Sequence, residues 1–245
     1  DSYRVSPLLL HQGKEVLTLA DTKAVHEKIA LEILGRKSLS PPDVGTILAH
    51  ALAARSERAL VQLTYAIMTA NSDIWKSLGD TVFWFPSIAL ESGQQIFGEN
   101  SFIDLMLRLS QYRVAAASKQ ADKALAIIDR TYEILAKQDE KIAIANTAMA
   151  YLVFLLTIEI PIPPRRSVVM LSRLIDISRA EHDFGDMFQG LLDKGNINLS
   201  LAGLSPAQTL FTFEAARITG LEDLKELLEA LNDLESEKRS YLLAA

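Results

Sequence analysis

The sequence predicts an all-α fold, an irregular stack of antiparallel helix hairpins of the tetratricopeptide-like or HEAT-like type (an α-solenoid or α-α superhelix). Apolar residues recur at the spacing of amphipathic helices along most of the chain. Short segments rich in proline, glycine and serine separate these helices, and short loops place consecutive helices antiparallel. The helix pairs recur about every 35–45 residues, as in helical-repeat proteins. The repeat is one of shape, because the residues themselves are not self-similar.

The composition limits the class of protein. The chain has 245 residues, of which 49% are hydrophobic, so it can bury a substantial core. Its formal net charge of -6 gives no electrostatic footprint for nucleic acid. The sequence contains no cysteine, which excludes disulfides and thiolate metal sites, and a cytoplasmic protein is expected. Because it starts at Asp1 without an initiator methionine or a signal peptide, we expect a part of a longer protein.

The N-terminal part predicts the end of a strand at residues 3–5, followed by two helices. Ser6 and the proline after it form a helix start signal. Asp21 or Thr22 is expected to cap the second helix, and Gly35 is expected to end it.

The next segments predict a helix hairpin and then an irregular aromatic region. Ser40 and the two prolines after it start a helix, and a tight break at residues 55–57 separates it from a second helix. Residues 72–98 combine two tryptophans and three phenylalanines with glycine and proline. This mixture predicts short helices with a kink.

The middle of the chain predicts three further helices. Asn100 or Ser101 caps the first, and residues 119–136 form the second. Residues 142–158, which follow a start signal at Asp139, are almost wholly apolar. This segment is short for a membrane span and is closely flanked by charges, so it predicts a buried central helix.

The C-terminal third combines a rigid connector, a loose segment and further helices. Residues 160–164 alternate isoleucine with proline and predict an extended connector into a helix that begins at Arg165. Residues 183–203 contain four glycines and predict at most one short helix, near residues 187–192. Ser205, followed by proline, starts another helix.

These elements predict one continuous helical-repeat domain over residues 1–245. Its parts are a junction or remnant of an upstream module at 1–36, a central helical stack at 37–180 and a C-terminal helix pair at 205–240. In that last pair, residues 221–237 form one strongly amphipathic helix, on which Leu228 is expected to pack.

Three segments near the N-terminus carry a resemblance to a known family. They read Tyr3-Arg4-Val5-Ser6-Pro7-Leu8-Leu9, Val25-His26-Glu27-Lys28-Ile29-Ala30 and Ile47-Leu48-Ala49-His50-Ala51-Leu52. This resembles the junction in STAND-type signalling ATPases where a winged-helix module gives way to a helical-repeat sensor region. The resemblance implies a sensor or scaffold arm, with the nucleotide site upstream of this chain. It transfers no functional residue, because the catalytic motifs of that family do not occur in this sequence.

The residues that could carry catalysis or bind a metal have simpler structural interpretations. His26 lacks the second histidine one turn away that a helical zinc motif needs, and His50 lies among apolar residues, which favours a packed side chain. Glu181, His182 and Asp183 are adjacent, so on a helix they point in different directions. We therefore expect no catalytic residue, no cofactor and no metal site.

Two groups of residues are candidates for binding a partner. They are the aromatic residues Trp75, Trp84 and Phe85 and the basic residues Arg165, Arg166 and Arg173. Aromatic side chains dominate the energetics of many interfaces, although core packing is the simpler interpretation of this group. The arginines of one helix could hold an anion or an acidic partner, or they could neutralise nearby carboxylates.

The sequence therefore favours a non-enzymatic, protein-binding or ligand-sensing helical scaffold in a larger signalling protein. The expected partner is a protein or peptide, with no nucleic acid and no membrane. Two alternatives remain open. One is a helical enzyme or enzyme subunit with an apolar ligand pocket near the Trp75–Phe97 aromatic cluster. The other is a self-association module that forms a homo-oligomer through the leucines between Leu221 and Leu234.

Overall fold

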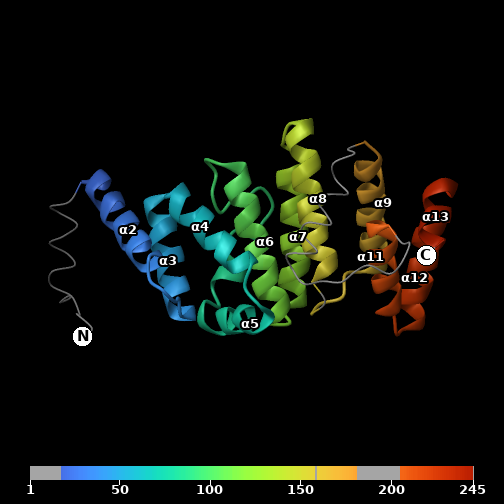
Figure 1. The fold of residues 1–245 in the computed structure, drawn as a ribbon, viewed down its shortest axis with the longest axis horizontal. Coiled ribbons are helices and arrows are strands. Elements are labelled where there is room, and N and C mark those ends of the chain that lie inside the picture. Colours follow the sequence, from blue (N-terminus) through green and yellow to red (C-terminus); the bar gives the residue numbers. More distant parts are fainter. Residues whose placement is uncertain (1–17, 158, 181–204, 245) are drawn as a thin grey trace. The chain divides into compact units, whose positions relative to one another are not determined.

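The computed structural model describes residues 18–157, 159–180 and 205–244. Every regular element in these ranges is helical and none is a strand, which confirms the all-α class (Figure 1). The chain divides into two compact units, residues 1–130 and 131–245, with the boundary inside the helix α7 (Ala121–Leu135). A single continuous domain over residues 1–245 stays a prediction.

The described part of unit 1 consists of consecutive helices, most of them joined by short loops, with a longer irregular segment at residues 88–100. They are α2 (Leu19–Leu34), α3 (Pro41–Ala54), α4 (Glu57–Met68), α5 (Ser72–Thr81), the short 3-10 helix η1 (Phe85–Ser87), α6 (Ser101–Ala117) and the first part of α7. Each helix packs on its neighbour in α2–α3, α3–α4 and α5–α6, and helices two apart also pack, in α2–α4, α3–α5 and α4–α6.

The helix boundaries of unit 1 follow from capping. Ser40 and Asp43 form a reciprocal capping box at the start of α3, as the sequence indicated. The helix α3 ends at Arg55, whose φ of 54° is left-handed, and the side chain of Ser56 caps α4. The expected cap of α2 at Asp21 or Thr22 was wrong. Thr18 is the cap, because its hydroxyl accepts from the Asp21 backbone N–H while Asp21 accepts from the Thr18 N–H.

One glycine in unit 1 is required by a close approach between helices. A Cβ atom on Gly79 of α5 would lie 1.7 Å from the Oγ and 2.9 Å from the Cβ of Ser118, at the end of α6. No side chain fits at that separation, so the missing Cβ allows α5 to pack closely on α6.

Unit 2 contains the end of α7 and the remaining helices. They are α8 (Glu140–Leu156), α9 (Pro164–Ala180), α11 (Pro206–Ala216), α12 (Leu221–Asn232) and α13 (Ser236–Leu243). Helix α9 packs on α8, α11 and α12, and α11 also packs on α8 and α13. The predicted start at Ser205 is confirmed by a capping box with Gln208.

The single helix expected over residues 221–237 was wrong, because α12 and α13 are separate helices (Figure 1). Asn232 and Asp233 end α12, and Glu235 is extended, with ψ 139°. Asparagine and aspartate compete with the helical backbone through their own side-chain hydrogen bonds. The regular spacing of leucines masked this break in the sequence.

The apolar helix α8 is buried along its C-terminal half, at Ala148 and Ala150–Leu155, whereas Ile142 near its start is exposed. In the described ranges, no helix combines the length and the apolar character needed to cross a bilayer. The expected strand end at residues 3–5, the helix from Ser6, the helix near residues 187–192 and the Glu181–Asp183 triplet lie outside the described residues.

Candidate partner-binding sites

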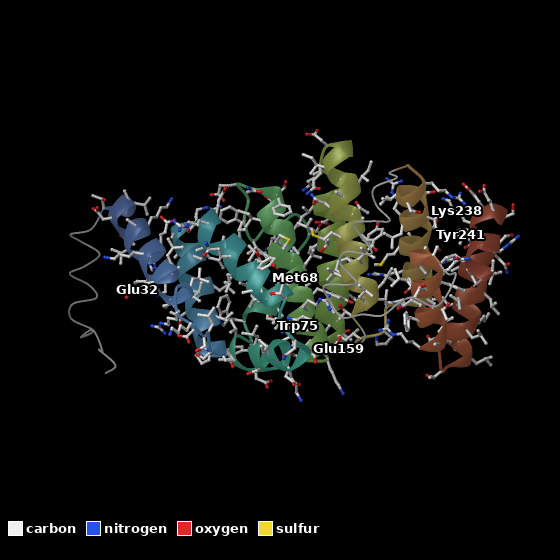
Figure 2. All side chains as sticks on the ribbon, in the orientation of Figure 1. Glu32, Met68, Trp75, Glu159, Lys238 and Tyr241 are labelled. Atoms are coloured by element: carbon white, nitrogen blue, oxygen red, sulfur yellow. The ribbon has the colours of Figure 1, made fainter. Side chains whose placement is uncertain are left out.

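Two of the three predicted aromatic residues belong to the core of unit 1. Trp75 on α5 is buried, its indole Nε1 donates to the Ile67 carbonyl at 2.6 Å, and the Arg113 guanidinium lies 4.7 Å from its ring centroid (Figure 2). Phe85 is also buried and meets the Trp84 ring edge to face, with centroids 6.4 Å apart. Core packing therefore accounts for Trp75 and Phe85, and Trp84 is the half-buried member of the group.

Trp84 lines a shallow hollow of about 470 Å³ between α3 and the segment after α5. The α3 side of this hollow is formed by small side chains, at Gly45, Thr46 and Ala49, and by His50. Its opposite side is formed by Thr81, Val82 and Trp84. Of the aromatic residues between positions 75 and 97, Trp84 lines this hollow, whereas an apolar pocket lined by Trp75 or Phe97 stays a prediction.

The lining of the hollow includes two threonine hydroxyls. The hydroxyl of Thr46 donates to the Pro42 carbonyl at 3.0 Å, and that of Thr81 donates to the Ser77 carbonyl at 2.7 Å. Both hydroxyls are therefore engaged with their own helices. The remaining polar side-chain groups of the lining are the imidazole of His50 and the indole N–H of Trp84.

His50 forms a pair with His26 of α2, and sequence reasoning had treated the two separately. Their Nδ1 atoms lie 2.6 Å apart, and the rings are tilted by 42° with centroids 4.7 Å apart. One ring must donate and the other accept, so the pair holds together when at least one imidazole is neutral. Burial lowers the pKa of His50, and the neighbouring His26 lowers it further. The two residues are 24 positions apart, and no local sequence signal connects them.

A buried polar cluster on α6 is the functional feature that sequence reasoning missed. Asp104, Arg108 and Gln111 are fully buried on one face of the helix. Asp104 accepts from the backbone N–H groups of Ile96 and Phe97 at 2.7 and 2.9 Å. Burial raises the pKa of Asp104, although these two hydrogen bonds act in the opposite direction.

Arg108 and Gln111 extend this cluster along the same segment. Arg108 donates to the carbonyls of Ile88 and Gln94, and Gln111 donates to those of Phe85 and Ile88. The cluster thus fixes the course of the irregular chain between η1 and α6. The signal in the sequence was the spacing of three polar residues at i, i+4 and i+7 on an otherwise apolar helix face.

In unit 2, the three predicted arginines of α9 lie in different environments. Arg165 pairs with Asp233, and its backbone N–H donates to Glu226 at 3.3 Å. Arg166 is half-buried. Arg173 is exposed, and its charge partly offsets the burial that raises the pKa of Tyr151. The pairing of Arg165 agrees with the alternative that these arginines neutralise carboxylates, and an anion site on α9 stays a prediction.

A second hollow, of about 320 Å³, lies within unit 2. The proline-rich connector before α9 forms one side, and α11 and α12 form the others. At its floor, Glu214 accepts from the Ser167 hydroxyl at 2.9 Å and pairs with Arg217. Arg217 also donates to the carbonyls of Thr157 and Ile160, so it anchors the connector.

Helix α12 has two apolar faces. Leu227, Ala230 and Leu231 are buried. Leu221, Leu224 and Leu228, spaced at i, i+3 and i+7, form a second row with exposed fractions of 80%, 43% and 53%. The expectation that Leu228 packs inside the protein was therefore wrong, because the adjacent Leu227 takes the buried position. We call Leu221, Leu224 and Leu228 the leucine row.

No family model, curated protein or solved structure matches this chain. Within the described ranges, no group of three or more histidine, aspartate or glutamate side chains converges as it would around a metal ion.

Proposed function

We propose that this chain is a non-enzymatic helical scaffold that binds a protein partner, and that it forms the sensor or scaffold arm of a larger signalling protein. The observation that carries this proposal is the leucine row of α12. Exposed apolar side chains in a contiguous row are a feature of protein-interaction sites, and a row at i, i+3 and i+7 suits a partner helix. A partner that covers these three leucines would remove apolar surface from water, which favours binding.

The packing in unit 1 supports a stack of the tetratricopeptide-like or HEAT-like type. Helices two apart in sequence pack on each other in α2–α4, α3–α5 and α4–α6. Helices α4 and α6 also begin side by side, since Asn100 donates to Glu57 at 3.5 Å and Arg55 pairs with Glu99. Alternating layers of parallel helices are typical of such repeats.

The alternative of an enzyme with an apolar pocket is supported by the hollow beside Trp84. The same hollow weakens that alternative, because both of its threonine hydroxyls are bonded to backbone carbonyls. The enzyme would be favoured by a small molecule that binds in this hollow, slows hydrogen exchange of the residues that line it and is converted to a product during incubation.

The partner proposal is tested by site-specific photo-crosslinking in the cells that make the full-length protein. A benzophenone amino acid at position 224 or 228 is expected to give the same discrete adduct from both sites, because these positions share one face. The control is position 222, whose glutamate is exposed on another face of α12. The double variant Leu224→Ser with Leu228→Ser is expected to abolish co-purification of the same partner while leaving the helical circular dichroism unchanged.

The outcomes separate the candidate functions. A heterologous protein in the adduct supports the scaffold. An adduct of two copies of this chain instead assigns the leucine row to self-association. The absence of any adduct from positions 224 and 228 would refute partner binding at this row. The link to a signalling ATPase is tested separately, by whether the gene encodes a phosphate-binding loop and a winged-helix module upstream of Asp1.

A further inference from the structure

We propose that the hollow of unit 2 binds an alkyl cation, namely the guanidinium or ammonium group of a basic side chain or of a small amine. The hollow would give the proposed scaffold a second binding surface. Only the statement that a peptide supplies the cation rests on the proposed scaffold function.

The positive charge already present in the hollow is fully engaged. The guanidinium of Arg217 pairs with Glu214 and donates to the carbonyls of Thr157 and Ile160 at 3.1 and 3.2 Å. The Glu214 carboxylate is likewise satisfied by Arg217 and by the Ser167 hydroxyl. This ion pair therefore has no net charge, and the part of the lining that it forms is neutral.

Two further carboxylates line the hollow without such compensation. Asp223 makes no hydrogen bond or ion pair to any residue in the described part of the chain. Glu226, one turn along α12, accepts only a 3.3 Å bond from the backbone N–H of Arg165. The guanidinium of Arg165 is directed to Asp233 instead. Glu214 and Arg217 neutralise each other, so the charged side chains of the lining carry a net charge of -2 from Asp223 and Glu226.

The helix dipole accounts for the position of only one of these carboxylates. Asp223 lies in the first turn of α12, where a negative charge interacts favourably with the helix dipole. Glu226 lies beyond that turn and receives little of this effect, because the interaction falls off within the first turn. A cation located between the two carboxylates would compensate both.

The walls of the hollow suit the apolar stem of such a cation. Ile162 and Pro163 of the connector face the same space as Ile218 and Leu227. Lysine and arginine bury their methylene chains on apolar surfaces while the charged end stays near polar groups. A volume of about 320 Å³ is at the small end of ligand sites, which fits one long side chain rather than a cofactor.

The test compares an arginine with its neutral isostere. The probes are the peptide acetyl-Gly-Arg-Gly-amide, the same peptide with citrulline in place of arginine, and agmatine as a free amine. Binding is followed by the chemical shifts of isotope-labelled Ile and Leu methyl groups in the whole chain. We expect the arginine peptide to shift Ile162, Ile218 and Leu227 and to bind at least about tenfold more tightly than the citrulline peptide, a difference of about 1.4 kcal/mol.

The variants Asp223→Asn and Glu226→Gln are each expected to weaken arginine binding, and the double variant to remove the preference over citrulline. Glu229→Gln is the matched control, because it removes a carboxylate from an exposed part of α12 that does not line the hollow. Unchanged methyl spectra without ligand confirm that the variants are folded. Tighter binding of the peptide than of agmatine assigns the cation to a peptide, and the reverse assigns it to a free amine.

Three results would overturn the proposal: equal binding of the arginine and citrulline peptides, binding that persists unchanged in the double variant, or no methyl shift at millimolar concentrations of any probe. These results are independent of the leucine row. Loss of the crosslinked partner in the Leu224→Ser and Leu228→Ser variant, with arginine binding retained, would separate the two surfaces.

Discussion

The Nδ1 atoms of His26 and His50 lie 2.6 Å apart and join α2 to α3 through a single hydrogen bond. Two imidazolium ions cannot share that bond, because both nitrogens would then be donors. The packing of the first helix of unit 1 is therefore sensitive to the protonation of this pair.

Stability is expected to fall as the pH is lowered through the range in which His50 titrates. Burial and His26 hold the pKa of folded His50 below its usual 6.5. At a pH between the lowered pKa of folded His50 and the ordinary value of 6.5, the unfolded chain binds more protons than the folded chain. The free energy of unfolding is therefore greatest above pH 6.5 and declines below it, by at most about 1.4 kcal/mol per pH unit. Urea unfolding at a series of pH values checks this. In His50→Gln the decline in this range should be smaller, and an unchanged slope would contradict it.

The α6 cluster is expected to show a graded response to substitution of Asp104. Asp104→Ala leaves the N–H groups of Ile96 and Phe97 without their acceptor and should cost about 2–4 kcal/mol. Asp104→Asn should cost less, since its amide retains one carbonyl oxygen and carries no buried charge. Chemical denaturation measures both. Equal losses in the two variants would mean that the acceptor oxygen is not what holds the segment.

Gly79→Ala is expected to destabilise unit 1 despite the better helix propensity of alanine. The added Cβ would meet Ser118, and overpacking should outweigh the propensity gain, for a net loss of about 1–2 kcal/mol. Adding Ser118→Gly removes the colliding atoms and should restore part of the loss. Gly35→Ala is the control, because its Cβ would make only ordinary contacts of 3.5–3.6 Å. Thermal melts of the wild type, Gly79→Ala, Ser118→Gly and their double variant complete the cycle, and Gly35→Ala is measured beside them.

Neighbouring leucines of α12 are expected to respond in opposite ways to aspartate. Leu227→Asp places a charge in a buried position and should cost more than about 3 kcal/mol, which is enough to unfold unit 2. Leu228→Asp should leave the fold intact, because the side chain is half exposed. Circular dichroism and hydrogen exchange of α9 and α12 distinguish them. A Leu228→Asp protein that unfolds would place this leucine inside the core after all.

Local chemistry in the sequence predicted much of the helix framework. The caps at Ser40, Asn100 and Ser205 satisfy backbone N–H groups within three residues of themselves, so a short motif is sufficient to find them. The cap at Thr18 was missed because Asp21, its capping-box partner, gave an equally strong signal.

The elements of the candidate sites depend on distant residues and were harder to predict. The pairing of His26 with His50 crosses two helices, and the anchoring of the connector by Arg217 spans 60 residues to Thr157. Hydrophobic periodicity identifies which face of a helix is apolar, but it does not say which of two adjacent leucines is buried. For this reason the sequence-based prediction placed Leu228 in the core, although Leu227 is the buried one of the two.

The α6 cluster binds main-chain atoms of its segment at Phe85, Ile88, Gln94, Ile96 and Phe97. Ala89 and Gly93 of this segment have left-handed φ angles of 53° and 78°, so these two positions tolerate few other residues. The other exposed positions among residues 91–95 are expected to accept substitutions without loss of these backbone contacts, much as an antibody framework carries variable loops.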